Sequence, residues 1–168
     1  RIELTGWGNF AHSTRAVLPL LQAYQLTGDT RYRDLAWESA SVQLGSNPQG
    51  LSYITGTGAR SPEHPLSKLS QYSPTGKALA GIPVNGPHYQ LPGTWPSTRA
   101  VNQSYWPESE GVERFSSYPA LRRYTDSNLL PPMSEPTIAE VAITGVALSL
   151  LSDEHAVTGW PAVQGNQE

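Results

Sequence analysis

Glu135 and Asp126 are the two carboxylates whose surroundings could support acid catalysis. Glu135 comes just before a long apolar helical pattern, and Asp126 is the nearest carboxylate before it in the chain. A carboxyl group on a rigid element can act as a general acid when desolvation or a neighbouring carboxylate raises its pKa. Each residue also has a structural alternative. The helix dipole stabilises a carboxylate in the first turn of a helix, and an Asp in the run Tyr-Thr-Asp-Ser-Asn commonly hydrogen-bonds its own turn.

His64 and two tryptophans are further candidates for contacting a ligand. His64 is followed by a proline in the run Ser-Pro-Glu-His-Pro, and Trp95 and Trp106 each precede a proline. Indole faces in proline-rich loops often stack on sugar rings or on protein partners, although they also fill cores. A lone histidine in a loop is equally compatible with an ordinary hydrogen-bonding position at the surface.

Several other kinds of chemistry are excluded by what the sequence lacks. The 168 residues contain no cysteine, which rules out disulfides and thiol catalysis. The four histidines show none of the short paired spacings of zinc sites, so no metal and no cofactor is expected. A net charge of -3 without a clustered basic face argues against a nucleic-acid partner. No uninterrupted apolar run reaches the roughly 18 residues of a membrane span, so no membrane partner is expected.

The first 45 residues predict a helical hairpin that would position these groups. Apolar residues repeat at helical spacing from Val17 to Leu26, and Thr27-Gly28-Asp29 supplies a helix stop followed by a helix cap. Pro19 is expected in the first turns of the first helix. Gly45 should end the second helix, which presents one side made of Tyr32, Leu35, Ala36, Ser39 and Val42.

The remaining chain predicts a long loop region followed by one buried helix. Twelve of the fifteen prolines fall within residues 46–135, where the only strand-like run is residues 51–55. The many aromatic residues in this stretch argue against disorder. A helix nearly apolar all round is expected to begin near Ser134, with Ser134 as its cap, and to end near Leu151. Three helices bury little around so much loop, so we expect part of the domain to be missing.

Residues 44–58, LGSNPQGLSYITGTG, closely resemble the LGxNPxGxSYVTGxG stretch of glycoside hydrolase family 9, the inverting cellulase family. The segments TGWGN at residues 5–9 and AYQLTGD at residues 23–29 are similar to the late helical hairpin of that family. The run His-Pro-Leu-Ser-Lys, residues 64–68, corresponds to the family's His-Pro-His-His-Arg type motif. His64 is kept, whereas Leu66 replaces the second histidine and Lys68 replaces the arginine.

A second motif of that family resembles the segment that leads into the last helix. Tyr124, Asp126 and Glu135 fall at the family's spacing, while Pro131 stands where an aromatic is usual and Val141 where an Asn is usual. The resemblance implies that Glu135 is the proton donor and that Asp126 helps to shape the site. It also implies sugar contacts, which we assign to His64, Lys68, Tyr124, Trp95 and Trp106.

The resemblance implies an all-α fold, in which residues 1–152 form the C-terminal part of an (α/α)6 barrel. Residues 153–168 would be a tail or linker. The family's catalytic base lies in an Asp-Ala-Gly-Asp motif that this chain does not contain. Inverting hydrolysis needs two carboxyl groups about 6.5–9.5 Å apart. We therefore expect the chain to be inactive alone and to need an N-terminal remainder, either a separate chain or a missing segment.

The implied reaction is hydrolysis, with inversion, of β-1,4-glycosidic bonds in a glucan-type polysaccharide by a secreted endoglucanase-like enzyme. Loss of a histidine and an arginine removes planar donors to sugar hydroxyls, which favours a decorated backbone such as xanthan, or an amino-sugar chain, over plain cellulose. One alternative is a non-catalytic carbohydrate-binding or scaffold remnant of the same fold. Another is a free-standing helical-hairpin interaction module, which would explain the first 45 residues but not the long loops.

Overall fold

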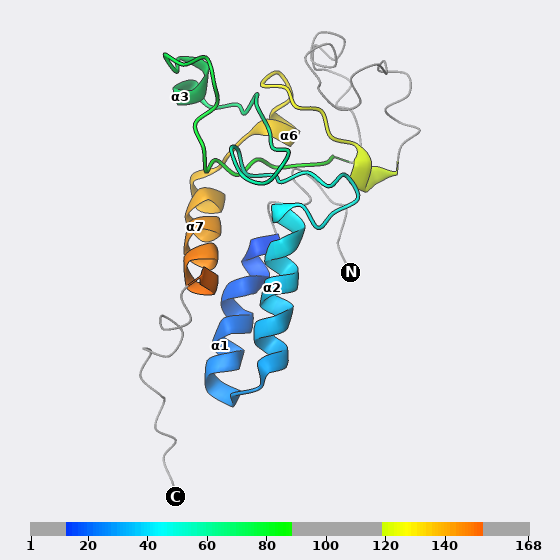
Figure 1. The fold of residues 1–168 in the computed structure, drawn as a ribbon, viewed down its shortest axis with the longest axis vertical. Coiled ribbons are helices and arrows are strands. Elements are labelled where there is room, and N and C mark those ends of the chain that lie inside the picture. Colours follow the sequence, from blue (N-terminus) through cyan, green and yellow to red (C-terminus); the bar gives the residue numbers. More distant parts are fainter. Residues whose placement is uncertain (1–12, 89–118, 153–168) are drawn as a thin grey trace, which may run out of the picture.

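The structure is a computed structural model that describes residues 13–88 and 119–152. In these residues the chain is helical, and the only β-pairing is an isolated bridge between Ile54 and Pro83. The all-α class is therefore confirmed, while the strand-like run at residues 51–55 forms this bridge and no ladder. The elements in chain order are η1 (Ser13–Ala16), α1 (Val17–Thr27), α2 (Thr30–Leu44), α3 (Lys68–Gln71), η2 (Ala120–Arg122), α6 (Pro131–Ser134) and α7 (Ile138–Ser152) (Figure 1).

Helices α1 and α2 form the predicted hairpin, with the predicted residues at its turn. Gly28 adopts the left-handed conformation at φ 70° and donates its N–H to the carbonyl of Tyr24 at 2.7 Å. Asp29 then caps α2, because its side chain accepts the N–H of Arg31 at 3.0 Å. Pro19 lies in the first turn of α1, where its missing N–H removes no helical hydrogen bond. The hairpin boundaries are thus set by local residue chemistry.

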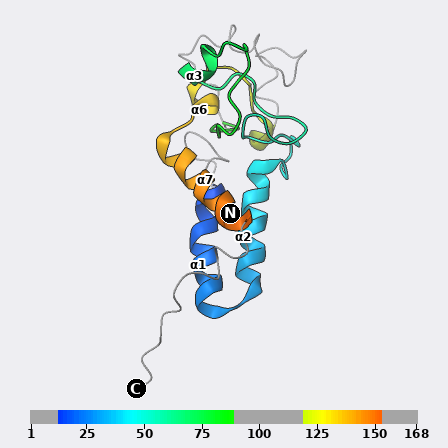
Figure 2. The same cartoon turned by 60° about the vertical axis from the view of Figure 1, so that its left-hand side comes forward.

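The three long helices meet in one apolar cluster, here called the helical layer. Its buried residues come from α1, α2 and α7: Val17, Leu21, Ala36, Ala40, Ala147 and Leu151. Figure 2 shows α7 lying across the hairpin. The predicted contact side of α2 was only partly right, since Ala36 is buried but Leu35 is 46% exposed. The buried residues of α2 are Ala36, Ala40 and Gln43, of which the two small alanines belong to the helical layer.

Helix α7 begins at Ile138 and not near Ser134, so the predicted start and cap were wrong. The reason is Pro136, which disfavours helical geometry in the residue before it. Glu135 is accordingly extended, with φ −76° and ψ 128°. The cap is Thr137, whose hydroxyl accepts the N–H of Glu140 at 3.2 Å and donates to the Glu140 carboxylate at 2.8 Å.

Helix α7 was predicted to be buried all round, and in this chain it is not. Its buried residues are Glu140, Thr144, Ala147 and Leu151, whereas Ile138 is 92% exposed. Residues 131–152 together are long and apolar enough to cross a membrane by length and composition alone. The break between α6 and α7 leaves a helix of 15 residues, about 22 Å long, which is shorter than the hydrocarbon core.

Above the helical layer, residues 45–88 and 119–134 form a loop layer with its own core (Figure 1). That core consists of Leu51, Tyr53, Val84, Tyr124, Leu130 and Met133. The rings of Tyr53 and Tyr124 pack edge to face, with centroids 5.2 Å apart. Backbone pairing adds to it, since the N–H of Val84 donates to the carbonyl of Tyr53 at 2.9 Å. The layer is irregular in secondary structure but fixed by these contacts.

Candidate active site

Asp126 joins two segments that are far apart in the sequence. Its carboxylate is fully buried and accepts the backbone N–H of Glu63 at 2.7 Å and that of His64 at 3.1 Å. The hydroxyl of Tyr124 donates to the same carboxylate at 3.3 Å. We call this arrangement the Asp126 clamp. It holds the loop that carries His64 against the segment that leads to Glu135.

The protonation of Asp126 reflects two opposing influences. Burial raises the pKa of the Asp126 carboxyl above its ordinary value of 3.8. The hydrogen bonds from Glu63 and His64, the charge of His64 and the hydroxyl of Tyr124 oppose that rise. All three donors come from the protein itself, so the carboxylate supports the loop that carries His64. This geometry favours a positioning role for Asp126, and a direct catalytic role stays a prediction.

Glu135 lies next to that clamp, at the end of the short helix α6. It is half-buried, and its N–H donates to the carbonyl of Pro131 at 3.0 Å. The preceding residue, Ser134, accepts the N–H of Leu66 at 2.9 Å. The loop that carries His64 is therefore fixed on both sides of the histidine, once by Asp126 and once by the residue beside Glu135. The structure brings together the His64 and Glu135 segments, which the sequence separates by about 70 residues.

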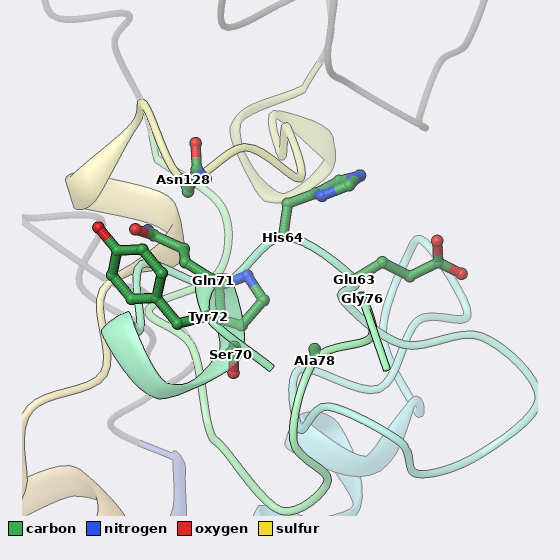
Figure 3. Close-up of a pocket in the computed structure, with 9 residues that line it drawn as sticks. Glu63, His64, Ser70, Gln71, Tyr72, Gly76, Ala78 and Asn128 are labelled. Carbon is green, nitrogen blue, oxygen red and sulfur yellow. The ribbon is translucent and has the colours of Figure 1, made fainter. Parts of the chain in front are cut away.

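A pocket of about 360 Å³ opens beside His64 (Figure 3). Figure 3 shows Gln71 and Tyr72 on one side of it and His64 with Glu63 on the other. Its described lining residues are Glu63, His64, Pro65, Ser70, Gln71, Tyr72, Gly76, Ala78 and Asn128. His64 is exposed in this opening and available for contact with a ligand.

The other predicted site residues take different positions. Lys68 is exposed at the start of α3 and is not among the described residues that line the pocket. Tyr124 is fully buried beneath the site, where it packs on Tyr53 and donates to Asp126. This placement favours a supporting role for Tyr124, and its contact with a sugar stays a prediction. Trp95 and Trp106 lie outside the described residues, as do residues 1–12 and the predicted tail at residues 153–168.

Gln71, Tyr72 and Asn128 line the pocket but could not be recognised as pocket residues from the sequence. None of them belongs to a motif, and only the folding of α3 beside the Asp126 clamp places them together. Among residues 13–88 and 119–152, no group of three or more His, Cys, Asp or Glu side chains is arranged to hold a metal ion. The chemistry available in the described pocket is that of carboxyl, imidazole, amide and hydroxyl groups.

The comparisons with known proteins identify the class of enzyme to which this fold and motif set belong. The model of glycosyl hydrolase family 9 matches residues 2–148, and the chain therefore belongs to this family. A curated relative, the xyloglucan-specific endo-beta-1,4-glucanase BoGH9A of Bacteroides ovatus, is 33% identical over 101 residues. That match covers 59% of this chain and 17% of the relative.

Solved structures of this family share the fold of the chain. A zinc-binding triple mutant of the family 9 endoglucanase J30 superposes with a TM-score of 0.68 at 25% identity, covering 91% of this chain and 26% of that one. A Bacteroides ovatus family 9 structure superposes with a TM-score of 0.65 at 24% identity, covering 90% of this chain and 23% of that one. The chain thus spans about a quarter of these structures and corresponds to part of their (α/α)6 barrel, as predicted.

Proposed function

We propose that this chain is the acid-bearing part of a catalytic domain that hydrolyses β-1,4-glycosidic bonds in a glucan-type polysaccharide. The observation that carries the proposal is the Asp126 clamp. It holds the His64 loop against the segment that leads to Glu135, and the N–H of Leu66 donates to the carbonyl of Ser134 beside it. His64 and Asn128 line the pocket, whereas Glu135 is not among its described lining residues. Family membership over residues 2–148 supports the reaction class.

In the proposed reaction Glu135 is the general acid. It donates its proton to the glycosidic oxygen as the bond from that oxygen to the anomeric carbon breaks. A water molecule bonds to the same carbon from the opposite face and loses its proton to a carboxylate base, which inverts the configuration. His64 and Lys68 would contact the sugar beside the cleaved bond, and Trp95 and Trp106 would line the approach.

The base is proposed to come from an N-terminal remainder of the domain, so this chain alone would be inactive. The open apolar face of α7 supports this, because Ile138 is 92% exposed, Val146 50% and Val141 41%. Exposed apolar surface of this kind is usually covered by protein. The family resemblance further suggests that the parent enzyme is secreted.

A decorated β-1,4-glucan is the proposed substrate. Leu66 and Lys68 replace a histidine and an arginine of the family motif, which weakens forked recognition of sugar hydroxyls. The curated relative is named for xyloglucan, a branched glucan. Xyloglucan, xanthan and unbranched cellulose derivatives are therefore the three substrates to compare first.

The deciding experiment replaces Glu135 in the complete catalytic domain. Glu135→Gln should lower the rate on polysaccharide by about 10²–10⁴-fold while leaving binding intact. On a dinitrophenyl glycoside the loss should be much smaller, because that phenol departs as an anion without needing a proton. Glu38→Gln, an exposed change on α2, serves as the matched control.

The outcomes separate the candidate functions. An unchanged polysaccharide rate in Glu135→Gln means that the carboxylate is structural. A wild-type domain that binds polysaccharide but cleaves none of the three substrates favours the alternative, a carbohydrate-binding or scaffold remnant of the same fold.

A further inference from the structure

The far side of the pocket beside His64 is lined by residues that the acid chemistry does not use. Ser70 and Gln71 come from α3, Tyr72 follows directly, and Asn128 comes from the turn after Asp126 (Figure 3). Two of these residues carry amides and two carry hydroxyls, which both donate and accept hydrogen bonds. Such a set matches a ligand whose surface alternates donors and acceptors, as a polyol does.

The charged side chains that line the pocket further limit the class of ligand that can bind there. Glu63 is the only carboxylate among the described lining residues, and no lysine or arginine lines this part of the pocket. A phosphate, a sulfate or an acidic sugar would meet the Glu63 charge, with His64 as the only described lining side chain that can carry a positive charge. The lining therefore suits a neutral ligand better than a strongly anionic one.

Tyr72 gives the pocket an aromatic face. Its side chain is 79% exposed although its backbone is fixed, since its N–H donates to the carbonyl of Lys68 at 3.0 Å. An exposed ring beside polar groups suits the apolar face of a sugar ring, with hydroxyls reaching the neighbouring amides. The volume of about 360 Å³ lies at the lower end of the range for small-molecule sites.

The walls of the pocket are held in place before any ligand binds. The hydroxyl of Ser67 accepts the N–H of Ser70 at 3.4 Å, and the hydroxyl of Ser70 accepts the N–H of Leu79 at 3.2 Å. The N–H of Gly76 donates to the carbonyl of Ser73 at 3.0 Å. Helix α3 and the following loop are thus tied together, which lowers the entropy lost on binding.

We propose that this pocket binds one neutral sugar unit of the polysaccharide, stacked on Tyr72 and hydrogen-bonded by Gln71 and Asn128. The inference rests on the proposed function, because the hydrogen bond from Leu66 to Ser134 places the pocket's loop beside Glu135. The unit belongs either to the glucan backbone or to a branch on it. Both sources present a neutral pyranose ring with hydroxyl groups, and the comparison of the two probes distinguishes them.

The test measures binding by calorimetry to the complete catalytic domain carrying Glu135→Gln, which should bind without cleaving. The probes are cellotetraose and a xylose-branched oligosaccharide with the same backbone. Adding Tyr72→Ala should weaken binding about tenfold, whereas Tyr72→Phe should keep most of the affinity because the ring remains. Leu69→Ala is the matched control, since Leu69 is 74% exposed on the same helix and does not line the pocket.

Weaker binding of both probes to Tyr72→Ala assigns the pocket to a backbone unit, and weaker binding of the branched probe alone assigns it to a branch. Unchanged binding of both probes overturns the inference, as does a Tyr72→Phe loss equal to that of Tyr72→Ala.

This result is separable from the proposed function, which depends on hydrolysis by the unsubstituted domain. If that domain cleaves no glucan while Tyr72→Ala weakens binding, the hydrolase proposal fails and the sugar pocket stands. If it cleaves glucan while Tyr72→Ala binds normally, only the sugar pocket fails.

Discussion

The helical layer and the loop layer are held together by different forces. The helical layer relies on apolar side chains from three helices, among them Val17, Leu21 and Leu151. The loop layer combines an apolar core that contains Tyr53 and Tyr124 with hydrogen bonds to backbone groups, above all those of the Asp126 clamp. The hydrophobic effect is non-directional, whereas a hydrogen bond prefers a particular distance and angle between its donor and its acceptor. The site is accordingly built on the loop layer.

The two layers also differ in how complete they are. In the loop layer the buried carboxylate of Asp126 has three protein donors and needs nothing further. In the helical layer α7 leaves Ile138 and Val146 uncovered. The buried carboxylate of Asp126 is therefore satisfied within this chain, while α7 leaves apolar surface open. Substitutions in the helical layer should therefore lower mainly the stability, and substitutions in the loop layer should lower mainly the activity.

The largest expected effect on stability comes from the helical layer. Leu21→Ala removes a side chain that is only 4% exposed and should lower the free energy of unfolding of the complete domain by about 2–5 kcal/mol. Urea denaturation followed by circular dichroism measures this change. At temperatures where the variant is still folded, kcat/KM on polysaccharide should stay near the wild-type value.

Gln22→Ala is the control, since Gln22 is exposed on the same helix and its loss should change stability by less than about 0.5 kcal/mol. A large fall in kcat/KM for folded Leu21→Ala would contradict the separation of the two layers.

The next largest expected effect is a loss of activity on substitution of Asp126 in the loop layer. Asp126→Ala leaves the N–H groups of Glu63 and His64 without their acceptor, so the His64 loop should shift relative to Glu135. A misplacement of about 1 Å costs on the order of 10²-fold in rate, and we expect kcat/KM to fall by about that factor. Amide hydrogen exchange at Glu63 and His64 should speed up in the same variant.

Tyr124→Phe sharpens this test because it removes one donor to Asp126 and keeps the ring against Tyr53. It should cost less activity than Asp126→Ala. Unchanged exchange at His64 in Asp126→Ala would show that the clamp does not hold the loop.

The difference between the layers also explains what the sequence could predict. Gly28 and Asp29 act on their nearest neighbours, so the hairpin turn could be predicted from the residues alone. The buried side of α2 could not, because which of Leu35 and Ala40 faces inward depends on how closely α1 and α7 approach. The start of α7 was misplaced because Ser134 looked like a cap, although Pro136 excludes a helical Glu135.

For the candidate site, the motif residues could be predicted from the sequence, but their contacts could not. Glu135, Asp126 and His64 belong to motifs that survive in the sequence, and the structure brings their segments together. The partners of Asp126 are backbone N–H groups, which every residue except proline carries and which therefore leave no sequence signal. Tyr72 lines the pocket only through the folding of α3, and no local pattern indicates this.

A smaller effect is expected where the two layers join. Thr137→Ala removes the cap of α7 and should lower the free energy of unfolding by about 1 kcal/mol. Thr137→Ser keeps the hydroxyl and should restore most of that loss. Because Glu135 lies two residues earlier, activity should fall slightly with the alanine variant and recover with serine, as measured by kcat/KM and thermal unfolding. Equal stability of the two variants would show that another residue caps the helix.

The smallest expected effect is a pH dependence of the free energy of unfolding that arises from Asp126 in the loop layer. Burial raises the pKa of Asp126 above 3.8, with His64 and Tyr124 as the side chains that oppose the rise. The folded protein then holds that proton more tightly than the unfolded chain. The contribution of Asp126 to stability is therefore largest below the unfolded pKa and is lost as pH rises through the raised folded pKa.

Asp126→Asn removes this titration, so the stability of the wild type relative to Asp126→Asn should decline as pH rises from below the ordinary Asp pKa through the raised folded pKa. Urea denaturation of both proteins across this range measures the difference. Leu21→Ala, which alters only the helical layer, should keep the wild-type slope. Parallel curves for the wild type and Asp126→Asn would mean that the carboxyl of Asp126 titrates at its ordinary pKa, with the clamp offsetting its burial in full.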